Sequence, residues 1–239
     1  MNLFITATDT DIGKTFITAG LAAIMQSLGY RAGVFKPIQS GAVQKNSFLI
    51  APDLAFVKKV DPYISTLSSY VLKPPVAPAL AAEIDKVKIE MSKIVKDYQI
   101  ICSKCDSVLV EGAGGIMTPC APDMFISDII KVLNLPVLII AGAQLGTINH
   151  VLLTLNHAKS LGLKVRGVII NKYPDKTDDL AVKTVVRMIE EYSDTKVVGI
   201  VKDLKNAKLT PGLIIDTILN SVDLEKIFNT KIPKLDLGL

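Results

Sequence analysis

The chain has 239 residues, of which 49% are hydrophobic and 5% aromatic, and its formal net charge is +4. This length allows one large domain or two small ones, with a well-buried core. The longest uninterrupted apolar run covers residues 137–143, far short of the roughly 20 residues that a membrane-spanning helix needs. Lysines are scattered among acidic residues and form no basic stripe. We therefore expect neither a membrane nor a nucleic acid as a partner.

The beginning of the chain and its cysteines indicate the compartment. The first residues show no basic region followed by an apolar stretch and a small-residue cleavage site, so no secretory signal is expected. Three cysteines, an odd number, suggest a reducing environment. We expect a cytoplasmic protein.

Apolar runs and amphipathic segments alternate along the chain, and they predict strands and helices in turn. Strands are predicted at residues 2–8, 32–38, 107–112, 136–142, 165–171 and 196–201. Helices are predicted at residues 14–29, 52–60, 91–105, 124–134, 147–162, 178–192 and 213–222.

This alternation is typical of an α/β fold: a doubly wound, mainly parallel sheet with helices on both faces. No composition shift, linker or repeat divides the chain, so we expect a single domain over residues 1–239. Residues 61–82, which contain four prolines, are the one long irregular connection that we expect. Loops of that length are usually functional or disordered, which favours a lid or substrate loop.

The first predicted strand is followed by ATDTDIGKT, residues 7–15, whose last three letters end a phosphate-binding loop. The usual pattern GxxxxGK[ST] has a glycine where Thr8 stands. The anion-binding groups lie further on, because backbone N–H groups of residues 10–15 and the start of the next helix would surround the phosphates. Lys14 would reach the β- and γ-phosphates, and the Thr15 hydroxyl would ligate Mg²⁺. The alternative is a turn with an incidental lysine; the strand–loop–helix context favours nucleotide binding.

Ligands of open parallel sheets bind beyond the carboxyl ends of the strands, and polar residues follow each predicted strand there. Glu111 ends one of these strands and is a candidate Mg²⁺ ligand. Asp53 is a second candidate, although its position alone favours an acid at a helix N-terminus. Lys36 ends another strand, where a phosphate or carboxylate partner is favoured over an exposed cation.

Other residue types that often carry chemistry have simpler interpretations here. Cys102 and Cys105 have CxxC spacing but no second pair, which favours structural thiols over a zinc site. His150 and His157 share one face of a predicted helix, where packed or solvated histidines are commoner than catalytic ones. Asn171-Lys172 is similar to the base-reading NKxD of GTPases, but the aspartate comes one residue late, which favours adenine over guanine.

Six segments, in this order, resemble the dethiobiotin synthetase family: TDTDIGKT, FKPIQSG, PDLAF, VEGAGG, LGTINH and IINK. The resemblance covers residues 2 to about 200. That family has threonine where the usual phosphate loop has its first glycine, as Thr8 is here. It implies an ATP-dependent ligase of biotin synthesis, a homodimer that binds 7,8-diaminononanoate, CO₂ and ATP with Mg²⁺.

The resemblance also implies a reaction. One amine captures CO₂ as a carbamate, the carbamate attacks the γ-phosphate of ATP, and the second amine closes the cyclic urea. ADP and phosphate leave. Positioning and electrostatic stabilisation would carry this chemistry, as in other phosphoryl transfers.

Matching motif positions imply a set of roles. Catalytic roles fall on Lys14, Lys36, Thr10 and Ser40, and the metal ligands would be Thr15, Asp53 and Glu111. The nucleotide would contact Asp11, Ile12, Gly13, Lys14, Thr15, Phe16 and Asn171. The diamine would contact Ser40, Gly112, Ala113, Gly114 and Asn149, the last from the partner subunit.

This chain departs from the family pattern at Ala7, Gln144 and Lys202, the last of which stands where a proline often forms an adenine wall. Two other classes compete with the ligase. A ParA/MinD-like switch ATPase would carry a second lysine early in the phosphate loop, and Thr8 to Ile12 contain none. A cobyric-acid-type amide ligase would need an additional amidotransferase domain.

Overall fold

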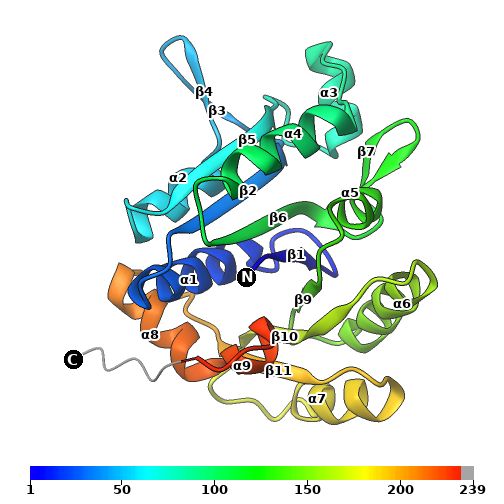
Figure 1. Cartoon of the computed structure of the whole chain (residues 1–239). Helices are drawn as coiled ribbons and strands as arrows, with labels where there is room; N and C mark the ends of the chain where they lie inside the picture. Colours follow the sequence, from blue (N-terminus) through cyan, green and yellow to red (C-terminus); the bar gives the residue numbers. More distant parts are fainter. Residues whose placement is uncertain (233–239) are drawn as a thin grey trace.

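The structure is a computed structural model that describes residues 1–232. Its centre is a seven-stranded sheet with the order β11-β10-β9-β1-β6-β2-β5, in which every neighbouring pair is parallel (Figure 1). The predicted doubly wound α/β fold is confirmed. These strands are β1 (Leu3–Ala7), β2 (Ala32–Gln39), β5 (Ser65–Val71), β6 (Ser107–Gly115), β9 (Val137–Ala141), β10 (Val165–Tyr173) and β11 (Val197–Lys202).

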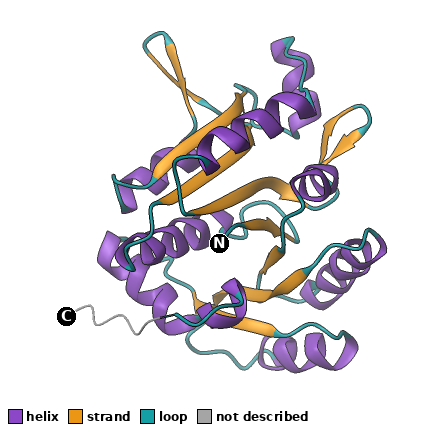
Figure 2. Ribbon diagram, in the orientation of Figure 1, coloured by secondary structure: helices purple, strands orange, loops and turns teal. Residues whose placement is uncertain are grey.

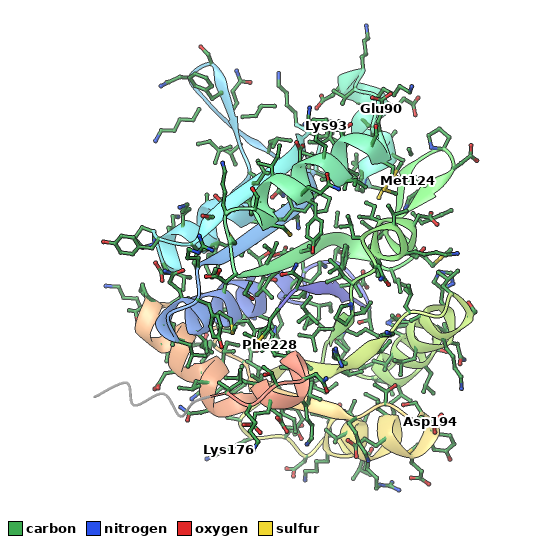
Figure 3. The ribbon with its side chains drawn as sticks, in the orientation of Figure 1. Glu90, Lys93, Met124, Lys176, Asp194 and Phe228 are labelled. Carbon is green, nitrogen blue, oxygen red and sulfur yellow. The ribbon has the colours of Figure 1, made fainter. Side chains whose placement is uncertain are left out.

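Helices cover both faces of the sheet and give the molecule two hydrophobic cores (Figure 2). The first core involves α1 (Lys14–Ser27), α2 (Pro52–Val60), α8 (Pro211–Ser221) and α9 (Leu224–Phe228). Phe228, labelled in Figure 3, belongs to it. The second core involves α3 (Pro78–Asp85), α4 (Met91–Cys102), α5 (Ile126–Leu133), α6 (Thr147–Ser160) and α7 (Leu180–Tyr192).

The central strands are apolar without alternation because both of their faces are covered. All five residues of β1 and all five of β9 are buried. None of the helices in residues 1–232 is long and apolar enough to cross a membrane.

The prediction for residues 61–82 was wrong, because this stretch contains β5 and the beginning of α3. β5 pairs only with β2 at the edge of the sheet, and six of its seven residues are partly exposed. An edge strand can therefore carry the polar sequence STLSSYV, and a search for apolar runs overlooks it. Pro75 to Pro78 nevertheless line the main cavity.

Two small antiparallel hairpins were also not predicted. One joins β3 (Val43–Lys45) to β4 (Phe48–Ile50), and the other joins β7 (Pro119–Ala121) to β8 (Met124–Phe125). Both stand out from the body of the molecule (Figure 2). Their strands are too short for a period-2 pattern to be visible in the sequence.

The topology determines where a ligand can bind. β1 lies between β6 and β9. The chain forms the strands on the β6 side of β1 first, and then crosses over β1 to form β9, β10 and β11 on its other side. Open α/β sheets bind ligands at such a switch point, beyond the carboxyl ends of the strands. The loop after β1 occupies this place.

Candidate active site

The loop between β1 and α1 has the backbone of an anion-binding turn. Asp11 has φ 54° and Gly13 has φ 95°, whereas Thr8 has no positive φ, and its N–H donates to the Ile140 carbonyl at 3.0 Å. Thr8 follows the last residue of β1 and still hydrogen-bonds to β9, so the missing glycine of the usual pattern is not needed there. A Cβ on Gly13 would lie 2.2 Å from Nδ2 of Asn171, so the glycine that the loop does require is Gly13.

Lys36, Asp53 and Glu111 form one ion cluster beside this loop. Nζ of Lys36 lies 2.6 Å from Oδ2 of Asp53 and 2.7 Å from Oε1 of Glu111. It also donates to the Gly112 carbonyl at 3.1 Å. The side chains of Lys36 and Glu111 are 4% and 1% exposed, and that of Asp53 is 27% exposed. Asp53 is thus both an acid in the first turn of α2 and a member of the cluster.

Thr15 connects the phosphate loop to this cluster, because its Oγ1 donates to Oε1 of Glu111 at 2.9 Å. The second carboxylate oxygen, Oε2, is buried and has no hydrogen-bond partner among the described residues. An unpartnered buried carboxylate oxygen is costly unless a cation or donor reaches it. Two carboxylates and one hydroxyl suit Mg²⁺, which uses few protein ligands and keeps water and phosphate oxygens.

The charges of the cluster follow from its geometry. Burial opposes the charged form of Lys36, but the carboxylates of Glu111 and Asp53 outweigh it and raise the pKa of Lys36. Burial likewise opposes the charge on Asp53, yet attraction to Lys36 gives a net lowering of its pKa. Burial, with Lys36 nearby, lowers the pKa of Lys14 to about 8. Two carboxylates facing one ammonium leave one negative charge unpaired, and a further cation would neutralise it.

Two cavities meet at the phosphate loop and share Gly13 and Lys172. The larger, about 1380 Å³, brings together many predicted site residues: Thr10, Asp11, Gly13, Lys14, Thr15, Lys36, Ser40, Asp53, Glu111, Ala113 and Gly114. The smaller, about 540 Å³, is lined by two further predicted residues, Phe16 and Asn171. The sequence signals of separate strands therefore converge on one site.

Three predicted residues line neither cavity. Ile12 is buried, and its carbonyl accepts from Nδ2 of Asn171 at 2.7 Å. Gly112 takes part through its carbonyl, which accepts from Lys36. Asn149 is exposed on α6 and lies outside both linings.

The structure adds residues to which the sequence analysis gave no role in the site. Gln39 lines the larger cavity, and its Oε1 accepts from the Asp53 N–H at 3.3 Å. The larger cavity continues along the α6 residues His150, Leu153, Thr154 and His157. The smaller one is closed by the segment after β11, through Lys202, Asp203, Leu204, Lys205, Ala207 and Leu209. Of these residues the sequence analysis named only Lys202, as a departure from the family's adenine wall, and the fold brings the whole segment to Asn171.

The cysteines and other metal-binding residue types give no second centre. Cys102, Cys105 and Cys120 are free thiols, and burial raises the pKa of Cys102 and that of Cys120, the latter to about 12. Within residues 1–232 no three His, Cys, Asp or Glu side chains converge on a metal site.

Comparisons with known proteins identify the family of this chain. Residues 1–209 match a family model described as an AAA domain. The ATP-dependent dethiobiotin synthetase of Anoxybacillus flavithermus is 40% identical over 205 residues, which cover 85% of this chain and 92% of that protein. The Bacillus subtilis enzyme of the same name is 33% identical over 226 residues, which cover 95% and 96%.

Solved structures share the fold at low identity. A plasmid partition protein from Borrelia burgdorferi bound to AMPPNP aligns with a TM-score of 0.59 at 15% identity, covering 95% of this chain and 97% of that one. The MinC:MinD cell division complex of Aquifex aeolicus gives a TM-score of 0.55 at 15% identity, covering 98% of each chain. At such identity the likeness concerns the fold alone.

The parallel sheet and the GKT loop at its switch point define a member of the P-loop nucleoside triphosphatase superfamily. Within it, the chain belongs to the family of ATP-dependent dethiobiotin synthetases, which are ligases.

Proposed function

We propose that this chain converts 7,8-diaminononanoate, CO₂ and ATP to dethiobiotin, ADP and phosphate with the help of Mg²⁺, as a cytoplasmic step of biotin biosynthesis. Besides family membership, one observation carries this proposal. The Thr15–Glu111–Lys36–Asp53 cluster joins the phosphate loop to a cavity of about 1380 Å³.

The reaction needs positioning more than covalent help from the protein. One amine of the substrate adds to CO₂ and loses a proton, which gives a carbamate. A carbamate oxygen attacks the γ-phosphorus, the bond to the bridging oxygen of ADP breaks, and a carbamoyl phosphate results. The second amine then attacks the carbamoyl carbon, phosphate leaves, and the cyclic urea closes.

The basic side chains would stabilise the charge that develops in this sequence. Lys14 reaches the phosphate end of the loop, where its Nζ donates to the Asp9 carbonyl at 3.1 Å. Lys36 lines the same cavity, is held by the carboxylates of Asp53 and Glu111, and would face the carbamate. Thr10 and Ser40 line the same cavity and would donate hydrogen bonds; the Oγ of Ser40 is buried without a partner in the described structure.

Thr15, Asp53 and Glu111 would hold Mg²⁺. When bound, Mg²⁺ neutralises phosphate charge and orients the γ-phosphate for attack. Residues 11–16 would surround the phosphates, and Asn171 with the segment after β11 would hold the adenine in the smaller cavity.

The diamine would lie against Gly112, Ala113 and Gly114, with Ser40 beside it. Asn149 does not reach the cavity of its own chain, which supports a role toward the site of a second copy. We therefore infer a homodimer with the substrate site near the subunit interface. Leu145, which is 83% exposed and lies just before α6, would be covered by that interface.

The test is phosphate release from ATP, Mg²⁺ and bicarbonate, measured with and without the diamine, while the urea product is followed by mass. Phosphate release that requires the diamine and matches dethiobiotin formation one to one supports the ligase. Hydrolysis of ATP that is indifferent to the diamine would instead favour a switch ATPase.

A further inference from the structure

Lys172 occupies a special place between the two cavities, and the reaction outlined above gives it no role. It is the last residue but one of β10, it is exposed, and it lines both cavities together with Gly13. A nucleotide with its base in the smaller cavity and its phosphates in the larger one would pass this point.

Consecutive side chains at the end of β10 hold consecutive carbonyls of the phosphate loop. Nζ of Lys172 donates to the Asp11 carbonyl, and Nδ2 of Asn171 donates to the Ile12 carbonyl at 2.7 Å. These contacts join segments about 160 positions apart in sequence. The phosphate loop is thus held from the end of β10 as well as by its own helix.

The consequence for a ligand follows from peptide geometry. In a trans peptide unit the C=O and the next N–H point in opposite directions. Fixing the Asp11 carbonyl toward Lys172 therefore fixes the Ile12 N–H on the other side. Fixing the Ile12 carbonyl toward Asn171 does the same for the N–H of Gly13. These are donors of the kind that bind phosphate in such loops.

The Asp11 backbone needs this support. Its φ of 54° is left-handed, a conformation that residues other than glycine adopt rarely. Without a partner for its carbonyl, the chain at Asp11 would relax toward negative φ, and the neighbouring N–H groups would turn.

We propose that Lys172 is a positioning residue for the nucleotide: it keeps Asp11 left-handed and so presents the phosphate-binding N–H groups before the ligand arrives. The inference rests on the proposed function only in taking an adenine nucleotide as the ligand. Loss of a charge-assisted hydrogen bond of this kind corresponds to about a tenfold weakening of ligand binding.

The experiment measures the Kd of MgADP by isothermal titration calorimetry on the full chain, together with kcat and the KM for ATP. K172M removes the donor and keeps the length of the side chain. K172R keeps a donor. K176M is the matched control, because Lys176 is an exposed lysine of the same connection that lines neither cavity (Figure 3).

Two further pairs separate positioning from direct contact. D11G and D11A both remove the carboxylate, but only glycine adopts the left-handed backbone without strain. Each is combined with K172M, and thermal unfolding of every variant checks that it is folded.

We expect K172M to raise Kd and KM about tenfold while kcat at saturating ATP stays within twofold. K172R and K176M should bind like the wild type, and K172M/D11G should recover most of the affinity while K172M/D11A should not. An unchanged Kd for K172M would overturn the proposal. A loss of affinity that D11G does not rescue would also overturn it, because Lys172 would then contact the nucleotide directly. Rescue by both D11G and D11A would overturn it as well, because only the charge of Asp11 would then matter. If the wild type bound no adenine nucleotide, the proposed function itself would fail.

Discussion

The ammonium of Lys36 and the carboxylate of Glu111 lie 2.7 Å apart, and both side chains are almost completely buried. They are 75 positions apart in sequence, but β2 and β6 are paired in parallel with Phe35 opposite Val110. Lys36 and Glu111 are the next residues along the two strands, so the register of the sheet places them side by side. A charged pair at this depth is costly to form and more costly to break.

Removing Lys36 should therefore destabilise the fold as well as the reaction. We expect K36M to lower the free energy of unfolding by about 3 kcal/mol, because Glu111 then stays buried without its countercharge. The double variant K36M/E111Q should lose less stability, since the buried charge of Glu111 is gone. Urea unfolding measures both. K88M, which breaks the exposed Lys88–Glu90 pair, is the control and should change stability by less than about 0.5 kcal/mol. Equal losses in K36M and the double variant would contradict this account.

Two threonines on α1 allow a matched test of the metal site. Oγ1 of Thr15 donates to Glu111, whereas the buried Oγ1 of Thr18, less than one turn further on, has no described partner. T15V should weaken Mg²⁺ binding and so raise the half-saturating Mg²⁺ concentration of the reaction about 10- to 100-fold. T18V should leave it unchanged and keep or raise stability. Activity titrated with Mg²⁺ at fixed ATP checks this, and similar curves for the two variants would argue against Thr15 as a ligand.

Glycine at position 13 is required for space as well as for backbone freedom. G13A would bring a Cβ to 2.2 Å from Nδ2 of Asn171, which would have to leave the Ile12 carbonyl. We expect MgADP affinity to fall at least about tenfold, from loss of that hydrogen bond and the backbone strain. Gly29 has a similar φ of 87° but nothing within 4 Å of an added Cβ. G29A thus carries the strain without the clash and should bind normally; a comparable loss in G29A would refute the steric explanation.

The pKa of Lys14, lowered to about 8 by burial and by Lys36, predicts a pH dependence of nucleotide binding. Below pH 8 the ammonium is charged and attracts phosphate; as the pH rises through 8 the free enzyme loses this charge, and kcat/KM for ATP should fall. For stability the sign is opposite. The unfolded state binds the proton up to its higher pKa, so stability without nucleotide should rise between about pH 8 and 10.5.

The matched variant for the pH profile is K14R, whose guanidinium stays charged throughout this range. Its kcat/KM should be lower overall but should lack the decline near pH 8. The profiles are measured at constant free Mg²⁺ and ionic strength. A decline that persists in K14R would assign the titration to another group.

The proposed homodimer predicts separate effects on assembly and on nucleotide binding. L145E places a charge on a leucine that is 83% exposed, next to the helix that carries Asn149. We expect it to dissociate the dimer in sedimentation and to impair diamine turnover at least about tenfold, while the Kd of MgADP is unchanged. L180E, at a leucine that is 73% exposed at the start of α7, is the control. A wild-type chain that sediments as a monomer would refute the dimer.

Local sequence determined much of this protein. Apolar runs identified six of the seven sheet strands: the five inner strands are largely buried on both faces, and the edge strand β11 is apolar although it is only partly buried. The GKT loop was recognisable because its backbone chemistry is local. Glu111 and Lys36 could be singled out because each lies near the end of a predicted strand, although in the structure β2 continues to Gln39 and β6 to Gly115. The polar edge strand β5 was overlooked, since only one of its sides is paired and its side chains are partly exposed.

The tertiary structure decided what depends on distant segments meeting. Asp53 looks like an ordinary helix acid until the register of β2 and β6 places Lys36 between it and Glu111. Lys172 belongs to the NKxD-like Asn171-Lys172 pair, but its sequence did not indicate a contact with the phosphate loop; only the order of the sheet strands brings it and the segment after β11 there. The spacing of residues in a sequence indicates the chemistry of one loop. An ion cluster, or a loop that is held from a strand distant in sequence, exists only once the sheet has formed.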